Sequence, residues 1–115
     1  MIILIKISIK DEIYPKSLKN ISDPPKRLYL EGNIDLLNSH SLAIVGSRNC
    51  SENGRKIAAK FASELSSTGI TIVSGLAVGI DEIAHNFSYN KKGKTIAVLR
   101  LRNKKYFSKR KFLAL

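Results

Sequence analysis

The residue types best suited to chemistry follow two glycines, each at the end of a short apolar run. Ser47 and Arg48 follow Gly46 after the first run, and the segment Ser-Gly-Leu-Ala over residues 74–77 follows the second. A glycine at the carboxyl end of a buried parallel strand lets the backbone turn sharply or approach a ligand closely. The helix that follows such a strand points its unpaired N–H groups and the positive end of its dipole at the same place. The two junctions therefore predict an anion site, where the Ser47 hydroxyl and the Arg48 guanidinium suit phosphate oxygens.

The elements that would position these junctions alternate between strands and helices. Short apolar runs predict strands over residues 42–46, 70–73 and 95–99. Ser51 is expected to cap a helix whose apolar residues share one face, and Gly69 follows it where a C-terminal cap is preferred. A second helix is expected from Asp81 to near Gly93. This βαβαβ order predicts half of a doubly wound parallel sheet, in which ligands gather outside the carboxyl ends of the strands.

The segment before the first of these strands is expected to be extended and irregular, because its prolines fix φ and disfavour helix. Isoleucines alternate with lysine and serine over residues 5–10, which predicts a strand. Residues 27–30 predict a short edge strand, and residues 34–37 one helical turn capped by Asn33 or Asp35. The apolar start of the chain is too short to span a bilayer and has no small-residue cleavage site after it, so we expect a cytoplasmic protein.

The formal net charge of +11 is concentrated at the C-terminal end of the chain. Ten of the 20 Lys and Arg residues lie in residues 91–115, which contain no Asp or Glu, whereas residues 1–90 are close to neutral. Such a tail attracts nucleic acid through counterion release, but a solvated, disordered end has the same composition. We divide the chain into a lead-in segment (1–41), a βαβαβ half-domain (42–99) and a basic tail expected to be disordered or degraded (100–115).

Several kinds of chemistry find no support in the sequence. The Gly-x-Gly-x-x-Gly fingerprint of dinucleotide domains and the Gly-Lys-Ser/Thr ending of nucleotide phosphate loops are both absent. Cys50 is the single cysteine, so an internal disulfide and a cysteine metal cluster are excluded, and we interpret it as a small loop residue. We therefore predict no cofactor and no metal.

Asp81 and His85 stand four residues apart, so their side chains would share one helix face and could pair. Such a pair can act as a general base or as half of a metal site. No third ligand, nucleophile or partner carboxylate accompanies it, which favours a structural role. For Asp81 that role would be capping of the second helix. His40 has no such group around it.

Five ordered motifs extend over about residues 5–99 and together resemble a known family. They are Tyr14-Pro15-x-x-Leu18, Asp23-Pro24-Pro25-x-x-Leu28-Tyr29-x-x-Gly32, Ala43-Ile44-Val45-Gly46-Ser47-Arg48, Val73-Ser74-Gly75-Leu76-Ala77-x-Gly79-Ile80-Asp81-x-x-Ala84-His85 and Gly93-Lys94-Thr95-Ile96-Ala97-Val98-Leu99. The resemblance is to the DNA-processing proteins called DprA or Smf. It implies an α/β fold, a partial Rossmann-like βαβαβ parallel sheet preceded by an extended N-terminal segment with a short edge strand.

The same resemblance implies that the chain binds single-stranded DNA in natural transformation and helps to load a RecA-type recombinase onto it, without catalysis. The implied contacts to DNA phosphate are Gly46, Ser47, Arg48, Ser74, Gly75, Leu76 and Ala77. Residues that would shape and brace the pocket are Gly79, Ile80, Asp81 and His85. Auxiliary basic candidates near the third parallel strand are Lys91, Lys92, Lys94, Arg100 and Arg102.

The chain departs from the family pattern after its third parallel strand. Arg100 stands where the family shows glycine. The family has a Tyr-Pro pair further along the chain, but this chain has Tyr106-Phe107, at a different spacing. We therefore expect a truncated form in which this third strand has an unpaired edge and the dimer surface is lost. A small nucleotide-binding or nucleotide-hydrolysing domain of related fold and a non-functional gene remnant both stay open as alternatives.

Overall fold

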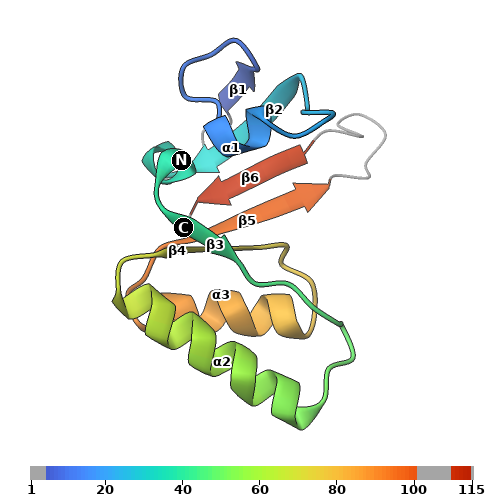
Figure 1. Ribbon diagram of the computed structural model, residues 1–115, viewed down its shortest axis with the longest axis vertical. Helices are drawn as coiled ribbons and strands as arrows, with labels where there is room; N and C mark the ends of the chain where they lie inside the picture. The colour runs from blue at the N-terminus through green and yellow to red at the C-terminus, as the bar shows by residue number, and fades with distance from the viewer. Residues whose placement is uncertain (1–4, 101–109, 115) are drawn as a thin grey trace.

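One mixed β-sheet organises the protein, in a computed structural model that describes residues 5–100 and 110–114 (Figure 1). Its strands lie in the order β1-β2-β6-β5-β4-β3. The strands are β1 (Ile5–Ser8), β2 (Arg27–Gly32), β3 (Ser41–Ala43), β4 (Thr71–Ser74), β5 (Thr95–Arg100) and β6 (Arg110–Ala114). The helices are α1 (Lys16–Lys19), the 3-10 helix η1 (Ile34–Asn38), α2 (Glu52–Ser67) and α3 (Ile80–Asn90).

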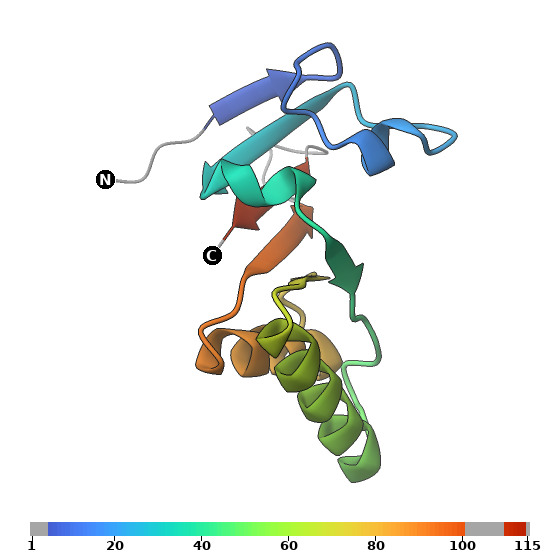
Figure 2. The same ribbon diagram turned by 60° about the vertical axis from the view of Figure 1, so that its left-hand side comes forward.

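The expected βαβαβ unit is confirmed, but its first strand is not the buried strand predicted over residues 42–46: β3 ends at Ala43, and its three residues are exposed. Strands β3, β4 and β5 are parallel, with Leu42 opposite Ile72 and Val73 opposite Ile96. Helices α2 and α3 lie side by side beneath this part of the sheet (Figures 1 and 2). Ala62 of α2, Ile72 of β4 and Ala84 of α3 form the buried core between helices and sheet. The small alanine side chains let both helices pack closely on the strands. The start of α3 lies near the carboxyl ends of β3 and β4, because only residues 75–79 separate it from β4 and its first N–H donates to the Ser47 carbonyl.

The predicted helix ends are confirmed at three places. The Ser51 hydroxyl accepts the Gly54 N–H at 3.0 Å and caps α2. Gly69 follows α2 with φ +92°, a conformation that favours glycine. Asn33 caps η1, since its side-chain oxygen accepts the Asp35 N–H at 3.2 Å. None of the helices in the described parts of the chain is long and apolar enough to cross a lipid bilayer.

The lead-in segment forms its own half of the sheet, with a separate cluster of buried side chains. Ile7, Tyr14, Leu28 and Leu30 pack together there, and the Tyr14 hydroxyl donates to the Pro25 carbonyl at 2.6 Å. The predicted strand over residues 27–30 exists as β2, but it is not an edge strand. It pairs with β1 on one side, antiparallel, and with β6 on the other, parallel.

Strand β6 also corrects two expectations about the end of the chain. Residues 110–114, expected to belong to a disordered tail, form a strand between β2 and β5. Strand β5 therefore has partners on both sides, and the open edge of the parallel part of the sheet belongs to β3. The physical reason is that unpaired backbone N–H and C=O groups of β2 and β5 are satisfied by the inserted strand. Residues 101–109 and 115, Arg102 among them, lie outside the described residues.

Candidate functional site

Two loops meet at the carboxyl ends of β3 and β4, as the sequence predicted. The first loop (residues 44–50) leads from β3 to α2, and the second loop (residues 75–79) leads from β4 to α3. The Ile80 N–H donates to the Ser47 carbonyl at 3.3 Å. Gly79 has φ +96°, and a Cβ built on it would lie 2.4 Å from the Ser47 carbonyl oxygen. The two loops are thus in direct backbone contact, and only glycine permits that approach at residue 79.

The Asp81 carboxylate joins the two loops. Its Oδ1 accepts the Gly46 N–H at 3.3 Å and its Oδ2 accepts the Gly75 N–H at 3.1 Å. The N-cap of α3 is Gly79, so the prediction that Asp81 caps this helix is wrong. The side chain is 7% exposed and acts as a built-in anion for the two glycine amides. We predicted that these amides would bind phosphate, but in the structure Asp81 already occupies them.

His85 links the second loop to strand β5 through two hydrogen bonds. Its Nε2 accepts the Leu76 N–H at 3.2 Å, and its Nδ1 lies 2.7 Å from the Thr95 hydroxyl. Because that hydroxyl donates its hydrogen to the Ile72 carbonyl, the Thr95 oxygen accepts from Nδ1–H. This arrangement requires a neutral imidazole with its proton on Nδ1. Burial lowers the pKa of His85, and the nearby Asp81 charge opposes that shift in part.

Asp81 and His85 therefore serve separate parts of the loops rather than forming a catalytic pair. Asp81 accepts from the two glycines, and His85 accepts from Leu76 and donates to Thr95. Among the described residues, no hydrogen bond joins the Asp81 side chain to the His85 side chain. Both are buried, which suits a structural role.

Acidification is expected to destabilise the protein through His85. The unfolded chain binds a proton on this residue near pH 6.5, whereas the folded protein does so only at lower pH. The unfolded state thus holds more protons in that interval, so the contribution of His85 to the free energy of unfolding is fully present above pH 6.5 and is lost as the pH decreases below it. Urea unfolding at several pH values measures this effect. His85→Gln should make the free energy of unfolding depend less steeply on pH, whereas His40→Gln, at an exposed site, should leave that dependence unchanged. The same dependence in both variants and in the unaltered protein would contradict the role assigned to His85.

Several groups remain available to an anion beside these occupied amides. Arg48 is exposed, and no ion pair engages it within the described part of the chain. The Ser47 hydroxyl accepts the Asn49 N–H at 3.0 Å and keeps its own hydrogen for a ligand. Across residues 5–100 and 110–114, the hydrogen bonds found leave the backbone N–H groups of Ser47, Arg48, Ala77 and Val78 without a partner. Val78 did not stand out in the sequence, where it is one apolar residue among several.

The structure does not bring the predicted auxiliary lysines to the loops. Lys91 is the C-cap of α3, and Lys92 and Lys94 follow it, at the opposite end of the helix from the second loop. Eleven helical residues separate the two ends by about 16 Å. At a helix C-terminus, positive charge offsets the negative end of the dipole. Arg100, by contrast, ends β5, whose parallel neighbour β4 ends at the second loop.

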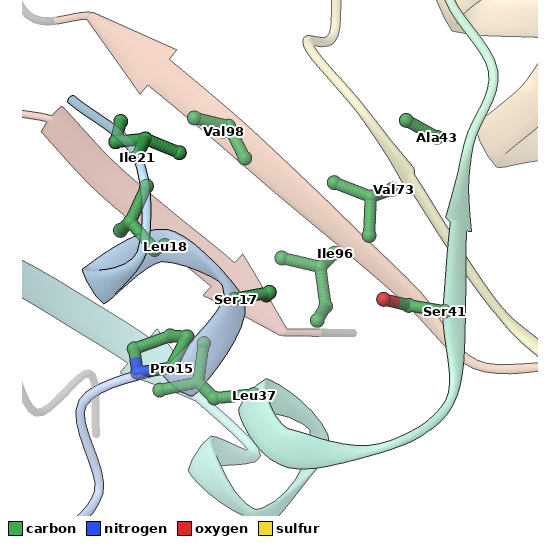
Figure 3. Close-up of a pocket in the computed structure, with 10 residues that line it drawn as sticks. All are labelled: Pro15, Ser17, Leu18, Ile21, Leu37, Ser41, Ala43, Val73, Ile96 and Val98. Atoms are coloured by element: carbon green, nitrogen blue, oxygen red, sulfur yellow. The ribbon is translucent and has the colours of Figure 1, made fainter. Parts of the chain in front are cut away.

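A groove of about 320 Å³ on the other face of the sheet is a poor candidate for binding an anion (Figure 3). Its floor is formed by Val73, Ile96 and Val98 of the parallel strands, and Leu18 and Ile21 of the lead-in segment close one side. No charged side chain lines it. Arg48 and the backbone N–H donors of the loops therefore make the loops the better candidate for an anion.

Comparison with known proteins decides the family. Residues 6–111 match the family of DNA recombination-mediator protein A. The chain belongs to this family. It is 47% identical over 92 residues to DNA processing protein DprA of Streptococcus pneumoniae, covering 80% of this chain and 32% of that protein. It is 42% identical over 93 residues to protein Smf of Escherichia coli, covering 81% of this chain and 25% of that protein. The resemblance inferred from the motifs is thereby confirmed.

Solved DprA structures share the fold. The crystal structure of DprA from Streptococcus pneumoniae superposes with a TM-score of 0.81 at 36% identity, covering 96% of this chain and 43% of that one. A DprA from Helicobacter pylori, described for its single-stranded DNA binding mode, superposes with a TM-score of 0.71 at 25% identity, covering 94% of this chain and 54% of that one. The chain thus spans about a third or less of the two curated relatives and about half of the solved structures.

Proposed function

We propose that this member of the DprA family binds single-stranded DNA through the two loops, with Arg48 as the main charged contact to a phosphate. The observation that carries the proposal is an exposed arginine at the carboxyl ends of parallel strands, beside backbone N–H groups; within residues 5–100 and 110–114 neither the arginine nor these groups have a partner. That edge is where open α/β sheets bind their ligands. The described binding of single-stranded DNA by the relative from Helicobacter pylori supports the choice of ligand.

The proposed contacts differ from those expected from the sequence alone. The Arg48 guanidinium offers two parallel N–H groups to two oxygens of one phosphate. The Ser47 hydroxyl and the free N–H groups of Ala77 and Val78 offer further donors from both loops. Gly46 and Gly75 do not donate to the phosphate, since their N–H groups are bonded to Asp81; they place the two loops beside each other. Because Asp81 fixes the loops before any ligand arrives, little conformational entropy is lost on binding.

We further propose that the site binds without catalysing a reaction. The groups that could act as acid or base at this edge, Asp81 and His85, are each held in hydrogen bonds to the backbone of the loops. No cluster of three or more His, Cys, Asp or Glu residues suited to a metal ion occurs among the residues that the structure describes. Binding alone requires only the donors already named.

The cellular part of the proposal follows the family. The chain, or the protein of which it is part, acts on incoming single-stranded DNA in natural transformation in the cytoplasm and passes the strand to a RecA-type recombinase. Family membership supports this role. The described residues supply the DNA contact of that role, and recombinase loading and self-association depend on the rest of the family's length, of which this chain spans about a third.

Arg48→Ala is expected to weaken binding of a labelled oligothymidylate by about 1–3 kcal/mol, because a charged hydrogen-bond donor to phosphate is lost. The slope of log affinity against log salt should fall by about one for the missing phosphate contact. Fluorescence anisotropy across salt concentrations measures both quantities. Arg27→Ala is the matched control, since Arg27 is also exposed but lies on β2, in the other half of the sheet. Equal affinities for the two variants would refute the assigned contact.

A further inference from the structure

Thr95, the first residue of β5, is fully buried, yet a series of hydrogen bonds connects its hydroxyl to the second loop. The hydroxyl donates to the Ile72 carbonyl at 2.8 Å, and its oxygen lies 2.7 Å from Nδ1 of His85. On the other side of the imidazole ring, Nε2 accepts the Leu76 N–H at 3.2 Å. One hydroxyl inside the sheet is thus connected, through a single side chain, to the backbone of the loop.

The Thr95 hydroxyl determines which nitrogen of His85 carries the proton. Its hydrogen is directed at the Ile72 carbonyl, so its oxygen accepts from Nδ1–H. With the proton on Nδ1, Nε2 of the neutral ring keeps the lone pair that the Leu76 N–H requires. The other neutral tautomer would set two donors, Nε2–H and the Leu76 N–H, against each other. The partner of one ring nitrogen therefore fixes the role of the other.

The bond to Leu76 also fixes the part of the second loop that follows it. Leu76 has φ +58°, a left-handed conformation that a non-glycine residue keeps only where the surrounding structure holds it. Its N–H is bonded to His85, whereas the N–H groups of Ala77 and Val78 have no partner among residues 5–100 and 110–114. Those two groups are the second-loop donors that the proposed function assigns to phosphate. Loss of the Leu76 bond would leave both donors on a backbone that is less firmly held.

We propose that Thr95 is a positioning residue for DNA binding, which fixes the phosphate donors of the second loop through His85; this inference rests on the proposed function. Thr95 does not contact the strand, because its side chain is fully buried. It acts by keeping the ring nitrogen that faces the loop free to accept. A loop that is already ordered loses less conformational entropy when the strand binds. The affinity for single-stranded DNA therefore depends on a hydroxyl group inside the sheet.

Thr95→Val replaces the hydroxyl by a methyl group and should weaken binding of oligothymidylate about two- to ten-fold, the range that the loss of one hydrogen bond spans. Thr95→Ser keeps the hydroxyl and should bind like the unaltered chain. Thr71→Val is the matched control. Thr71 is likewise the fully buried first residue of a parallel strand, but its hydroxyl is bonded to that of Ser39 at 2.7 Å. This control should lose stability in urea and keep its affinity in the anisotropy measurement.

The His85 ring reports the mechanism separately from affinity. The ¹⁵N chemical shifts of an imidazole distinguish a protonated from an unprotonated nitrogen. Above pH 6.5, where His85 is neutral, the unaltered chain should carry the proton on Nδ1. In Thr95→Val the proton should move at least in part to Nε2, and the Leu76 N–H should exchange faster with solvent. In Thr71→Val both signals should stay as they are in the unaltered chain.

The outcomes separate this inference from the proposed function. If Thr95→Val binds oligothymidylate as tightly as the unaltered chain while Arg48→Ala binds weakly, the phosphate site stands and the role of Thr95 is overturned. Equal losses of affinity in Thr95→Val and Thr71→Val also overturn it, since the effect is then general destabilisation. A ring proton on Nε2 in the unaltered chain overturns it even if Thr95→Val does not fold. If the unaltered chain binds no oligonucleotide, the proposed function and this inference both fail.

Discussion

Asp81→Ala should lower the free energy of unfolding by about 2–4 kcal/mol, because it removes the charged acceptor of two part-buried backbone hydrogen bonds. The carboxylate accepts the N–H groups of Gly46 and Gly75, one from each loop, and its side chain is buried. Alanine keeps the helix propensity of α3 but removes both acceptors. Urea unfolding followed by circular dichroism measures the loss.

Two further variants separate the hydrogen bonds of Asp81 from its charge near the start of α3. Asp81→Asn keeps one acceptor oxygen and should recover part of the loss. Glu82→Ala removes a neighbouring exposed acid from the same first helical turn, so it reports the interaction with the helix dipole alone, which is about 0.3–1 kcal/mol. Equal destabilisation by Asp81→Ala and Glu82→Ala would show that the link between the loops contributes nothing.

Gly79→Ala is expected to cost about 3 kcal/mol or more and to weaken single-strand binding as well. A Cβ at residue 79 would lie 2.4 Å from the Ser47 carbonyl oxygen and 2.7 Å from that of Arg48. These are backbone atoms, which cannot rotate away, so the first loop has to move and carry Arg48 with it. Urea unfolding and oligothymidylate anisotropy on the same variant measure the two effects.

Gly69→Ala provides a closely matched control for this clash. Gly69 has φ +92°, against +96° at Gly79, but a Cβ there would meet no atom within 4 Å. It therefore incurs only the cost of a left-handed backbone, about 1–2 kcal/mol, and should leave DNA binding unchanged. If the two variants lose the same stability and both bind DNA normally, the loops do not depend on their contact at Gly79.

Strands β4 and β5 could be predicted from the sequence because buried parallel strands are continuous apolar runs, such as the one ending at Val98-Leu99. The cap at Ser51 could be predicted because capping is local. The pairing of β6 with β2 could not be predicted, since its partners in β2 lie about 80 residues earlier in the chain and no local pattern specifies such pairing.

The candidate site divides in the same way between local and distant contacts. The meeting of the two loops follows from the strand–turn–helix pattern, whereas the bond from Asp81 to Gly46 joins residues 35 positions apart. The preference of Asp for helix caps, on which the prediction for Asp81 rested, does not indicate a hydrogen bond from its carboxylate to another loop. The position of Lys91 could have been predicted. A helix that starts at the second loop, beside the carboxyl ends of the strands, must end near their amino ends.

The most direct test of the account is a titration of the ¹⁵N-labelled chain with oligothymidylate, followed by NMR. We expect the largest shifts at the backbone N–H groups of Ser47, Arg48, Ala77 and Val78, which have no hydrogen-bond partner among the described residues. Lys91, at the other end of α3, should move little. Shifts centred on residues 91–94, with both loops unchanged, would contradict the claim that the paired loops bind the strand.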